Sequence, residues 1–181
     1  MPDAPDDLTL GLFRRVRREL TAAVEGLDDD ALIWRPSPAT HSIGWLAWRI
    51  TRGQDRNLSE LMGIPQLWLS DGWADHFHRP ADPSDTGLGH TPEQVAAFHA
   101  PGSKDLLAYH DVVHTRTERY LTEAPDHDPA LTVPSPTLPY SPAAQERLQG
   151  LLADFFTHLG QITLLVNLLP DHARTASGTG T

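Results

Sequence analysis

Three polar residues near the end of the sequence have the spacing needed to work together. Asp154, His158 and Gln161 are four and three residues apart, so on a helix of about 3.6 residues per turn their side chains form one column. A carboxylate and an imidazole one turn apart can bind a divalent ion, although catalytic sites normally take three ligands from the protein. The alternative interpretation is structural, with His158 at the border of an apolar stripe and hydrogen-bonded to Asp154 on its own helix.

The second candidate is a pair of histidines, His110 and His114, which are again one helical turn apart. A His-x-x-x-His pair on one helix face is a two-ligand platform for a metal ion or for catalysis. In a chain with 10 histidines such a pair also arises by chance, so a structural role is the alternative. Of the other histidines, His90 is expected to fix its loop by hydrogen bonding, and His76 and His78 are expected at the surface.

Arg49 is the third candidate because of its position. It lies one turn after Trp45 and next to Trp48, on an expected helix that is apolar most of the way round and must be covered on more than one side. An unpaired buried charge is very costly, so Arg49 must reach solvent or find a carboxylate. The simpler interpretation is that its stem lies across a tryptophan ring and its guanidinium lies in water.

These candidates belong to stretches whose apolar residues recur at three- and four-residue steps, the pattern of helices with a buried face. Four such stretches predict four long helices, at about residues 8–27, 42–62, 103–124 and 141–169. Asp6 or Asp7 can cap the first helix and Ser103 the third, while Pro170 stops the fourth. No stretch alternates like a strand, so the sequence predicts an all-α protein, an up-and-down four-helix bundle.

A long crossover segment joins the second and third predicted helices. It runs from about residue 64 to 101 and contains Trp68, Trp73 and Phe77, which we expect to cover the second helix. Segments of this length are usually functional or wrapped on the body of the protein. Within it, the sequence that begins at Thr91 has the capping box and early proline typical of a helix start, and predicts a short helix.

Composition limits the classes of function. With 181 residues and no cysteine, the chain is expected to form one domain and has no disulfide or thiolate of its own. A formal charge of −10 argues against partners that are bound through clustered Lys and Arg, so neither nucleic acid nor a membrane is an expected partner. No stretch approaches the roughly 20 apolar residues of a membrane helix, and the N-terminus does not resemble a signal peptide, which predicts a cytoplasmic protein.

Two regions are predicted to lie outside the helices. Residues 126–140 are rich in Pro, Asp and Ser and predict an extended loop. Residues 171–181 contain little that could be buried and predict a flexible C-terminal tail. The helical domain is therefore expected to span residues 1–170.

Two motifs resemble those of a known family. Residues 42–50 (Ser-Ile-Gly-Trp-Leu-Ala-Trp-Arg-Ile), followed by 54–55 (Gln-Asp), and residues 158–161 (His-Leu-Gly-Gln) are similar to the two signature helices of the DinB-like superfamily. The linking segments at 71–73, 80–83, 86–91 and 109–111 resemble an actinobacterial, mycothiol-transferase-like branch of it. The resemblance covers nearly the whole chain up to Leu169. It implies a four-helix bundle, often dimeric, in a family that includes thiol-dependent transferases and isomerases using mycothiol or bacillithiol.

The resemblance also implies a metal site, from which this sequence departs. Family members hold a divalent metal, often zinc or nickel, with one histidine of the second helix and a His-x-x-x-His pair of the fourth. His158 matches the last histidine, Asp154 stands at the position of the other, and Arg49 stands at the second-helix position. A carboxylate can still ligate, whereas a guanidinium stays protonated and cannot. The resemblance thus implies a degenerate site, with at most a weakly bound zinc or nickel ion on Asp154 and His158, joined by His110 if it reaches inward. It also predicts that Arg49 pairs with Asp154 in the place of the metal.

Two functions of different classes follow. The first is an enzyme, a thiol-dependent (mycothiol-type) S-transferase or isomerase that acts on a small electrophile with a low-molecular-weight thiol as cosubstrate. In the family, the metal lowers the pKa of this thiol. The alternative is a non-catalytic small-molecule-binding or sensor protein that kept the bundle and pocket but lost the metal. A purely structural dimerisation module would leave the polar column unexplained. The catalytic candidates are Arg49, Asp154 and His158. The residues expected to line the substrate pocket are Trp45, Trp48, Trp73, His110, His114 and Gln161.

Overall fold

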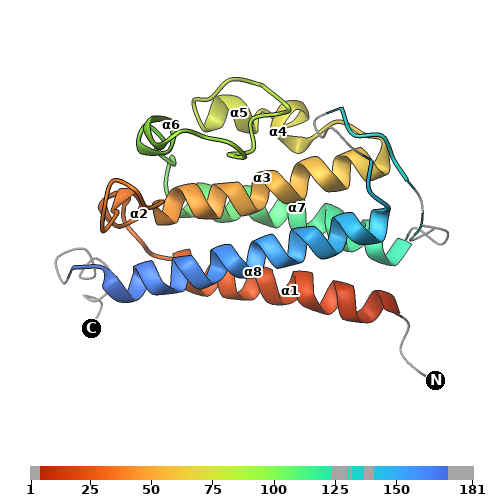
Figure 1. The fold of residues 1–181 in the computed structure, drawn as a ribbon, viewed down its shortest axis with the longest axis horizontal. Coiled ribbons are helices and arrows are strands. Elements are labelled where there is room, and N and C mark those ends of the chain that lie inside the picture. Colours follow the sequence, from red (N-terminus) through yellow and green to blue (C-terminus); the bar gives the residue numbers. More distant parts are fainter. Residues whose placement is uncertain (1–4, 124–129, 131, 137–140, 171–181) are drawn as a thin grey trace.

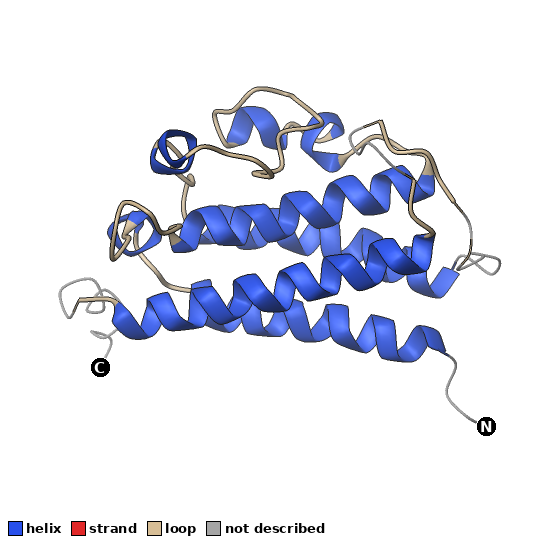
Figure 2. Ribbon diagram, in the orientation of Figure 1, coloured by secondary structure: helices blue, strands red, loops and turns tan. Residues whose placement is uncertain are grey.

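The computed structural model describes residues 5–123, 130, 132–136 and 141–170. In this part of the chain the helices are α1 (Pro5–Val24), α2 (Asp29–Ile33), α3 (Ile43–Met62), α4 (Leu67–Ser70), α5 (Trp73–His76), α6 (Pro92–Ala96), α7 (Ser103–Glu123) and α8 (Ala144–Leu168). The described ranges contain no strand, only one isolated bridge between Thr132 and Ala143 (Figure 2). The prediction of an all-helical protein is confirmed. Besides the four long helices and the predicted short helix α6, the described residues form the short helices α2, α4 and α5.

The four long helices lie side by side (Figure 1). α1 and α3 each pack against both α7 and α8, and the apolar faces of all four meet in a common core. Core side chains that are at most 1% exposed include Phe13, Val16 and Leu20 of α1 and Phe155 and Ile162 of α8. Removing such side chains from water is the main stabilising contribution to a fold of this kind.

The order of colours in Figure 1 shows how the long helices are connected. α1 runs opposite to α3, and α8 runs opposite to α7, but α3 and α7 run in the same direction. The chain must therefore return along the length of α3 before α7 begins. Residues 63–102 make this return and are called the covering segment below. Strict up-and-down alternation thus does not hold between α3 and α7.

Capping explains where α3 begins and ends. Ser42 is its N-cap, and the Ser42 hydroxyl accepts a hydrogen bond of 3.2 Å from the backbone N–H of Trp45. Gly63 ends the helix with a left-handed φ of 64°, which glycine adopts without steric cost. In the covering segment, Thr91 and Gln94 form the capping box that was predicted at the start of α6.

Other predicted bounds differ from the observed ones by a few residues. α1 begins at Pro5, so Asp6 and Asp7 belong to the helix and do not precede it. α7 begins at Ser103 itself, and α8 begins at Ala144, slightly later than predicted. The predicted tail, residues 171–181, and most of the predicted loop at 126–140 lie outside the described residues.

α3 is the most enclosed helix, with 17 of its 20 residues buried. α7 and α8 cover one side of it, and the covering segment lies over the other (Figure 1). The ring of Trp48 on α3 lies 4.9 Å from that of Phe98 and 6.0 Å from that of Trp68, measured between ring centres. Trp68 also packs against Phe77 and against Tyr109 of α7. The prediction that this segment covers the second long helix is confirmed.

α8 alone among the described helices has the length and mean hydropathy of a membrane-spanning helix. Part of its apolar face is used inside the protein, where Leu148, Leu151, Phe155, Leu159 and Ile162 belong to the core, whereas Leu164 and Leu168 are exposed. The core helix of a water-soluble protein meets the same criterion of length and composition. The hydropathy of α8 is therefore only a weak indication of a membrane span.

Candidate functional site

The side chains of Arg49 on α3 and Asp154 on α8 meet between the two helices. Arg49 Nη2 lies 3.5 Å from Asp154 Oδ2, and the two side chains are 12% and 36% exposed. From Nη1, Arg49 also donates a hydrogen bond of 3.0 Å to the backbone carbonyl of Thr86 in the covering segment. The structure thus contains the predicted pair. Because Asp154 is partly open to solvent, the pair is weaker than a fully buried one.

Each charge of this pair stabilises the other. Burial lowers the pKa of the Arg49 guanidinium, and the charge of Asp154 opposes this effect. At Asp154 burial acts to raise the pKa, but the contact with His158 and the charge of Arg49 outweigh it, so the pKa of the carboxyl is lowered. Both groups are therefore charged near neutral pH.

His158 extends this group along α8. Its Nε2 lies 3.3 Å from Asp154 Oδ1, and its Nδ1 lies 3.2 Å from Oε1 of Gln161, so the predicted column of three polar side chains is present. The contact at Nε2 has an ion-pair distance but not hydrogen-bond geometry, so Nε2 has no hydrogen-bond partner. Nδ1 can donate to Gln161, or accept if Gln161 turns its amide NH2 group toward it. In the tautomer with its proton on Nε2, Nδ1 is the basic atom of the ring.

Trp45, one turn before Arg49, lies against His158 from the side of α3. The two rings meet edge-on with their centres 6.5 Å apart. Trp45 Nε1 donates a hydrogen bond of 3.2 Å to His90 Nδ1, which places the proton of a neutral His90 on Nε2, and Asp85 Oδ1 lies 2.9 Å from that atom. These bonds fix the loop of the covering segment on α3, as predicted for His90.

The close approach of the covering segment requires a glycine at position 87. Gly87 has a φ of +83°, and a Cβ atom there would lie 2.8 Å from Cζ2 of Trp45 and 3.0 Å from Cδ of Arg49. Any larger residue would therefore clash with α3 and strain the backbone. The absence of a side chain lets the neighbouring carbonyl of Thr86 reach the Arg49 guanidinium.

A cavity of about 420 Å³ lies beside the Arg49–Asp154 pair, between α3 and α8. Its volume is within the range of about 300–1,000 Å³ that is usual for small-molecule sites. The residues that line it are Arg49, Arg56, Asn57, Leu88, Pro142, Glu146, Arg147, Gly150, Leu151 and Asp154. Three arginines thus border one cavity in a chain whose net charge is negative.

Two of these arginines, Arg56 and Arg147, were not among the residues predicted for the site. Their spacing does carry a signal, because Arg49 and Arg56 are seven residues apart and so are Arg147 and Asp154. Seven residues are close to two helical turns, so each pair lies on one helix face. Spacing within a helix cannot show that these two faces turn toward each other.

A buried ion pair below the covering segment was also missed. Arg52 and Asp55 are fully buried and lie 3.5 Å apart, from Nη1 to Oδ2. Asp55 accepts hydrogen bonds of 2.9 and 2.8 Å from the N–H groups of Leu67 and Trp68, where α4 begins. Arg52 donates a hydrogen bond of 3.0 Å to the backbone carbonyl of Asp85. This network holds the start and the middle of the covering segment on α3, whereas the sequence pointed to Asp55 only through the family resemblance.

None of the three tryptophans predicted for the pocket lines this cavity. Trp48 is fully buried under the covering segment, where its ring contacts Phe98 and Trp68. Trp73 lies on α5, and its ring centre is 5.0 Å from that of Tyr109 on α7. Both side chains contribute to the aromatic cluster that attaches the covering segment to the long helices.

The two histidines of α7 also face other partners. His110 Nδ1 lies 3.1 Å from the hydroxyl of Thr51, and burial lowers the pKa of His110 to about 3, so the ring is neutral. His114 lies 3.5 Å from Glu118 and borders a separate cavity of about 540 Å³ between α1 and α7. Burial lowers the pKa of His114 as well. The structure therefore does not bring either histidine to Asp154 and His158.

The site has too few donor side chains for a tightly bound divalent metal ion. Asp154 and His158 supply two ligands, whereas a tightly bound catalytic ion normally takes three from the protein. The adjacent cation, Arg49, cannot coordinate a metal, and His110 is turned toward Thr51. In the part of the chain that the structure describes, no group of three or more His, Asp or Glu side chains could hold a metal ion. The residues present thus do not fit a tightly bound metal of the three-ligand kind.

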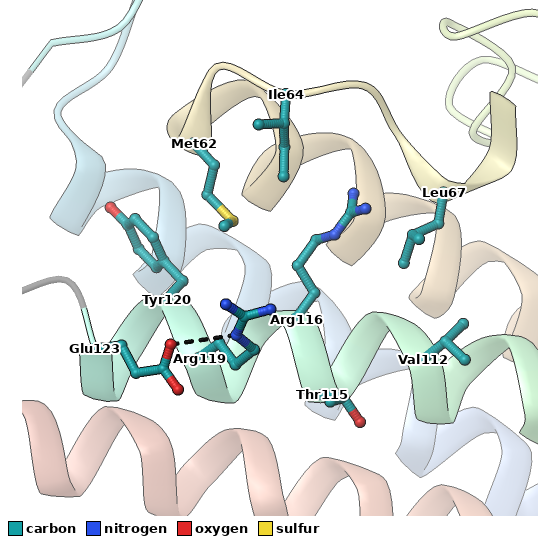
Figure 3. Close-up of a pocket in the computed structure, with 9 residues that line it drawn as sticks. All are labelled: Met62, Ile64, Leu67, Val112, Thr115, Arg116, Arg119, Tyr120 and Glu123. Carbon is teal, nitrogen blue, oxygen red and sulfur yellow. Dashed lines mark hydrogen bonds and ion pairs between the residues drawn. The ribbon is translucent and has the colours of Figure 1, made fainter. Parts of the chain in front are cut away.

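A larger cavity, of about 670 Å³, lies between the end of α3 and α7 (Figure 3). Its charged side chains already have partners. Arg119 Nε lies 3.2 Å from Glu123 Oε2, and Arg116 donates hydrogen bonds to the hydroxyl of Ser59 and the carbonyl of Pro65. Its apolar lining includes Met62, Ile64, Leu67 and Val112. The cavity between α3 and α8 is the better candidate, because it borders the Arg49–Asp154 pair and contains an arginine, Arg56, that has no ion-pair partner among the described residues.

Fold and site define a helical protein whose cleft contains an ion pair between two long helices with a histidine beside it. The sequence profile of the DinB superfamily matches residues 12–162, and the chain belongs to that superfamily. The crystal structure of a conserved protein from Enterococcus faecalis is similar, with a TM-score of 0.80 and 23% sequence identity, covering 91% of this chain and 96% of that one. At this identity the likeness concerns the fold alone. A search of curated proteins gave no match.

Proposed function

We propose that this protein is a DinB-superfamily member that binds a small molecule without the help of a metal ion. The observation that carries the proposal is the distance of 3.5 Å between Arg49 Nη2 and Asp154 Oδ2. By family resemblance these residues and His158 stand at the metal-ligand positions, where a guanidinium supplies positive charge but no ligand. The ion pair then holds α3 and α8 together in place of the metal, and the adjacent cavity takes the ligand.

The proposal extends to the architecture and setting of the protein. The four long helices form the four-helix bundle of the superfamily, and the covering segment is its crossover. The protein acts in the cytoplasm on a small molecule, as a monomer or as a homodimer of the kind common in the family. Size-exclusion chromatography with light scattering measures the oligomeric state directly.

The proposal is tested by ligand screening in the presence of a chelator. Compounds that raise the melting temperature of the protein in EDTA are compared between the wild-type chain and Asp154→Asn, which breaks the ion pair. The matched control is Asp105→Asn, because Asp105 is a partly exposed carboxylate that pairs with His76 at 2.7 Å, away from the cavity. We expect stabilisation that Asp154→Asn removes and Asp105→Asn retains. Compounds that act only after zinc or nickel is added would contradict the proposal.

The contact between His158 and Asp154 favours a second function, thiol-dependent S-transfer of the mycothiol type. In this reaction His158 Nδ1 takes the proton of an incoming thiol, and the thiolate attacks the electrophilic carbon and displaces its leaving group. The charge of Arg49 favours the thiolate over the thiol.

This function is tested with mycothiol and 1-chloro-2,4-dinitrobenzene, whose chloride is displaced by the thiolate. We expect His158→Gln to lower the rate by about 100-fold or more, because a positioned general base contributes that much. An equal rate for the variant and the wild-type protein would exclude His158 as the base.

A further inference from the structure

Arg56 is the one arginine at the cavity between α3 and α8 that lacks a partner among the described residues. Arg49 contacts Asp154 at 3.5 Å, and Arg147 forms an ion pair with Glu60. Arg56 is only 7% exposed, yet its Nε is buried without a hydrogen-bond partner, and no described carboxylate lies within ion-pair distance of its guanidinium. A buried arginine of this kind is unusual, because arginine is rarely buried unless it is paired.

The surroundings of Arg56 make its positive charge unfavourable. Burial lowers its pKa, Glu60 opposes this, and the positive charges of Arg49 and Arg147 add to the effect of burial. Arg147 also lines the cavity between α3 and α8, and its Nη1 is likewise buried without a hydrogen-bond partner. Unused buried donors and unpaired buried charges destabilise a protein. Arg56 and Arg147 therefore both line this cavity, and each carries a buried guanidinium nitrogen without a hydrogen-bond partner.

The rest of the lining is compatible with an organic anion. Leu88, Leu151 and Pro142 provide apolar surface next to the arginines. Glu146 is the remaining carboxylate of the lining, but it is exposed and accepts a hydrogen bond of 3.4 Å from the backbone of Ala143 at the start of α8. It does not neutralise Arg56.

We propose that the cavity binds the oxyanion group of a small organic ligand, a carboxylate or a phosphate, through Arg56 and Arg147. Guanidinium groups bind both oxyanions through paired, charge-assisted hydrogen bonds, and a ligand at this position supplies the missing partner of Arg56. The apolar wall formed by Leu88 and Leu151 takes the organic part. This inference rests on the proposed function because it names the ligand class for the same cavity.

The test uses two probes, inorganic phosphate and succinate, each compared with sodium chloride at equal ionic strength. Binding is measured by calorimetry and by the shift in melting temperature. Arg56→Gln is the informative variant, and Arg119→Gln is the control, because Arg119 is an exposed arginine paired with Glu123 outside the cavity. We expect at least one probe to bind the wild-type chain, and Arg56→Gln to weaken that binding about 10- to 100-fold. Arg119→Gln should bind as the wild type does.

A second readout separates a binding role from a structural one. Removing an unpaired buried charge relieves repulsion, so unliganded Arg56→Gln should melt at the same or a higher temperature than the wild type. A lower melting temperature together with unchanged binding would overturn the inference, and so would a wild-type chain that binds neither probe. If the wild-type chain binds neither probe, the proposed function is judged separately. Binding of an uncharged compound in the presence of EDTA would leave that function intact, whereas binding that requires zinc or nickel would refute it.

Discussion

Replacing Asp55 by asparagine tests how the covering segment is held on α3. Asp55 is fully buried and accepts hydrogen bonds from the N–H groups of Leu67 and Trp68 and, at 2.7 Å, from the hydroxyl of Tyr109. Asparagine has nearly the same shape, but one of its two oxygens becomes an NH2 donor. That donor must face another donor, and the charge of Arg52 loses the carboxylate that lies 3.5 Å away.

The expected magnitude follows from these contacts. Removing one partner of a buried ion pair costs about 3–5 kcal/mol. Arg52 keeps its bonds to Gln66 and to the carbonyl of Asp85, so the lower end, about 3 kcal/mol, is expected. For a chain of this length about 1 kcal/mol corresponds to roughly 2–4 °C, so the melting temperature should fall by about 6–12 °C.

Urea and thermal unfolding of Asp55→Asn measure this effect. The control is Asp111→Asn, because Asp111 is half exposed and pairs with Arg17 at 2.7 Å, and an exposed pair contributes about 1 kcal/mol or less. Hydrogen exchange in Asp55→Asn should increase first in the covering segment. If Asp55→Asn is no less stable than Asp111→Asn, the network does not hold the covering segment in the way described.

Two further predictions concern stability. The pKa of His110 is about 3 in the folded chain, against 6.5 ordinarily, so the unfolded chain binds the proton more tightly. The free energy of unfolding should therefore fall through His110 as the pH falls from about 6.5 toward 3. Between pH 7 and pH 4.5, His110→Asn should remove up to about 2–3 kcal/mol of the fall in the free energy of unfolding, as measured by urea unfolding. If the pH dependence of the variant equals that of the wild type, His110 is not buried as described. Gly87→Ala should lower the free energy of unfolding by about 1–3 kcal/mol, because its Cβ would lie 2.8 Å from Trp45. The control Gly160→Ala, where a Cβ meets nothing within 4 Å, should raise it by about 0.5–1 kcal/mol, and equal effects of the two changes would contradict the close approach.

The helices could be predicted from sequence because local patterns determine them. Ser42 and Gly63 mark the ends of α3 through caps that depend on single residues, and the capping box at Thr91 acts within one turn. Apolar periodicity gave the buried faces of the long helices for the same reason. These signals do not depend on what each helix packs against.

The site could be predicted only in part, because it depends on which faces meet. The resemblance to the DinB-like superfamily led to the pair of Arg49 and Asp154, but periodicity alone gives a helix face and not its neighbour. Arg56 and Arg147 lie on different helices 91 residues apart in sequence, so no local pattern joins them. His110 was predicted to point inward and is buried, yet its partner is Thr51 rather than the site.

The measurement that tests the central claim most directly is the metal content of the wild-type chain and of Arg49→His. Both proteins are incubated with zinc or nickel and dialysed without chelator, and their metal content is measured by inductively coupled plasma mass spectrometry. The claim is that the Arg49 guanidinium, 3.5 Å from Asp154, takes the place of a metal ion. It predicts well under one metal ion per wild-type chain, and a clear gain for Arg49→His, which removes a cation and adds a third ligand beside Asp154 and His158. One tightly bound metal ion per wild-type chain, or no gain for Arg49→His, would contradict it.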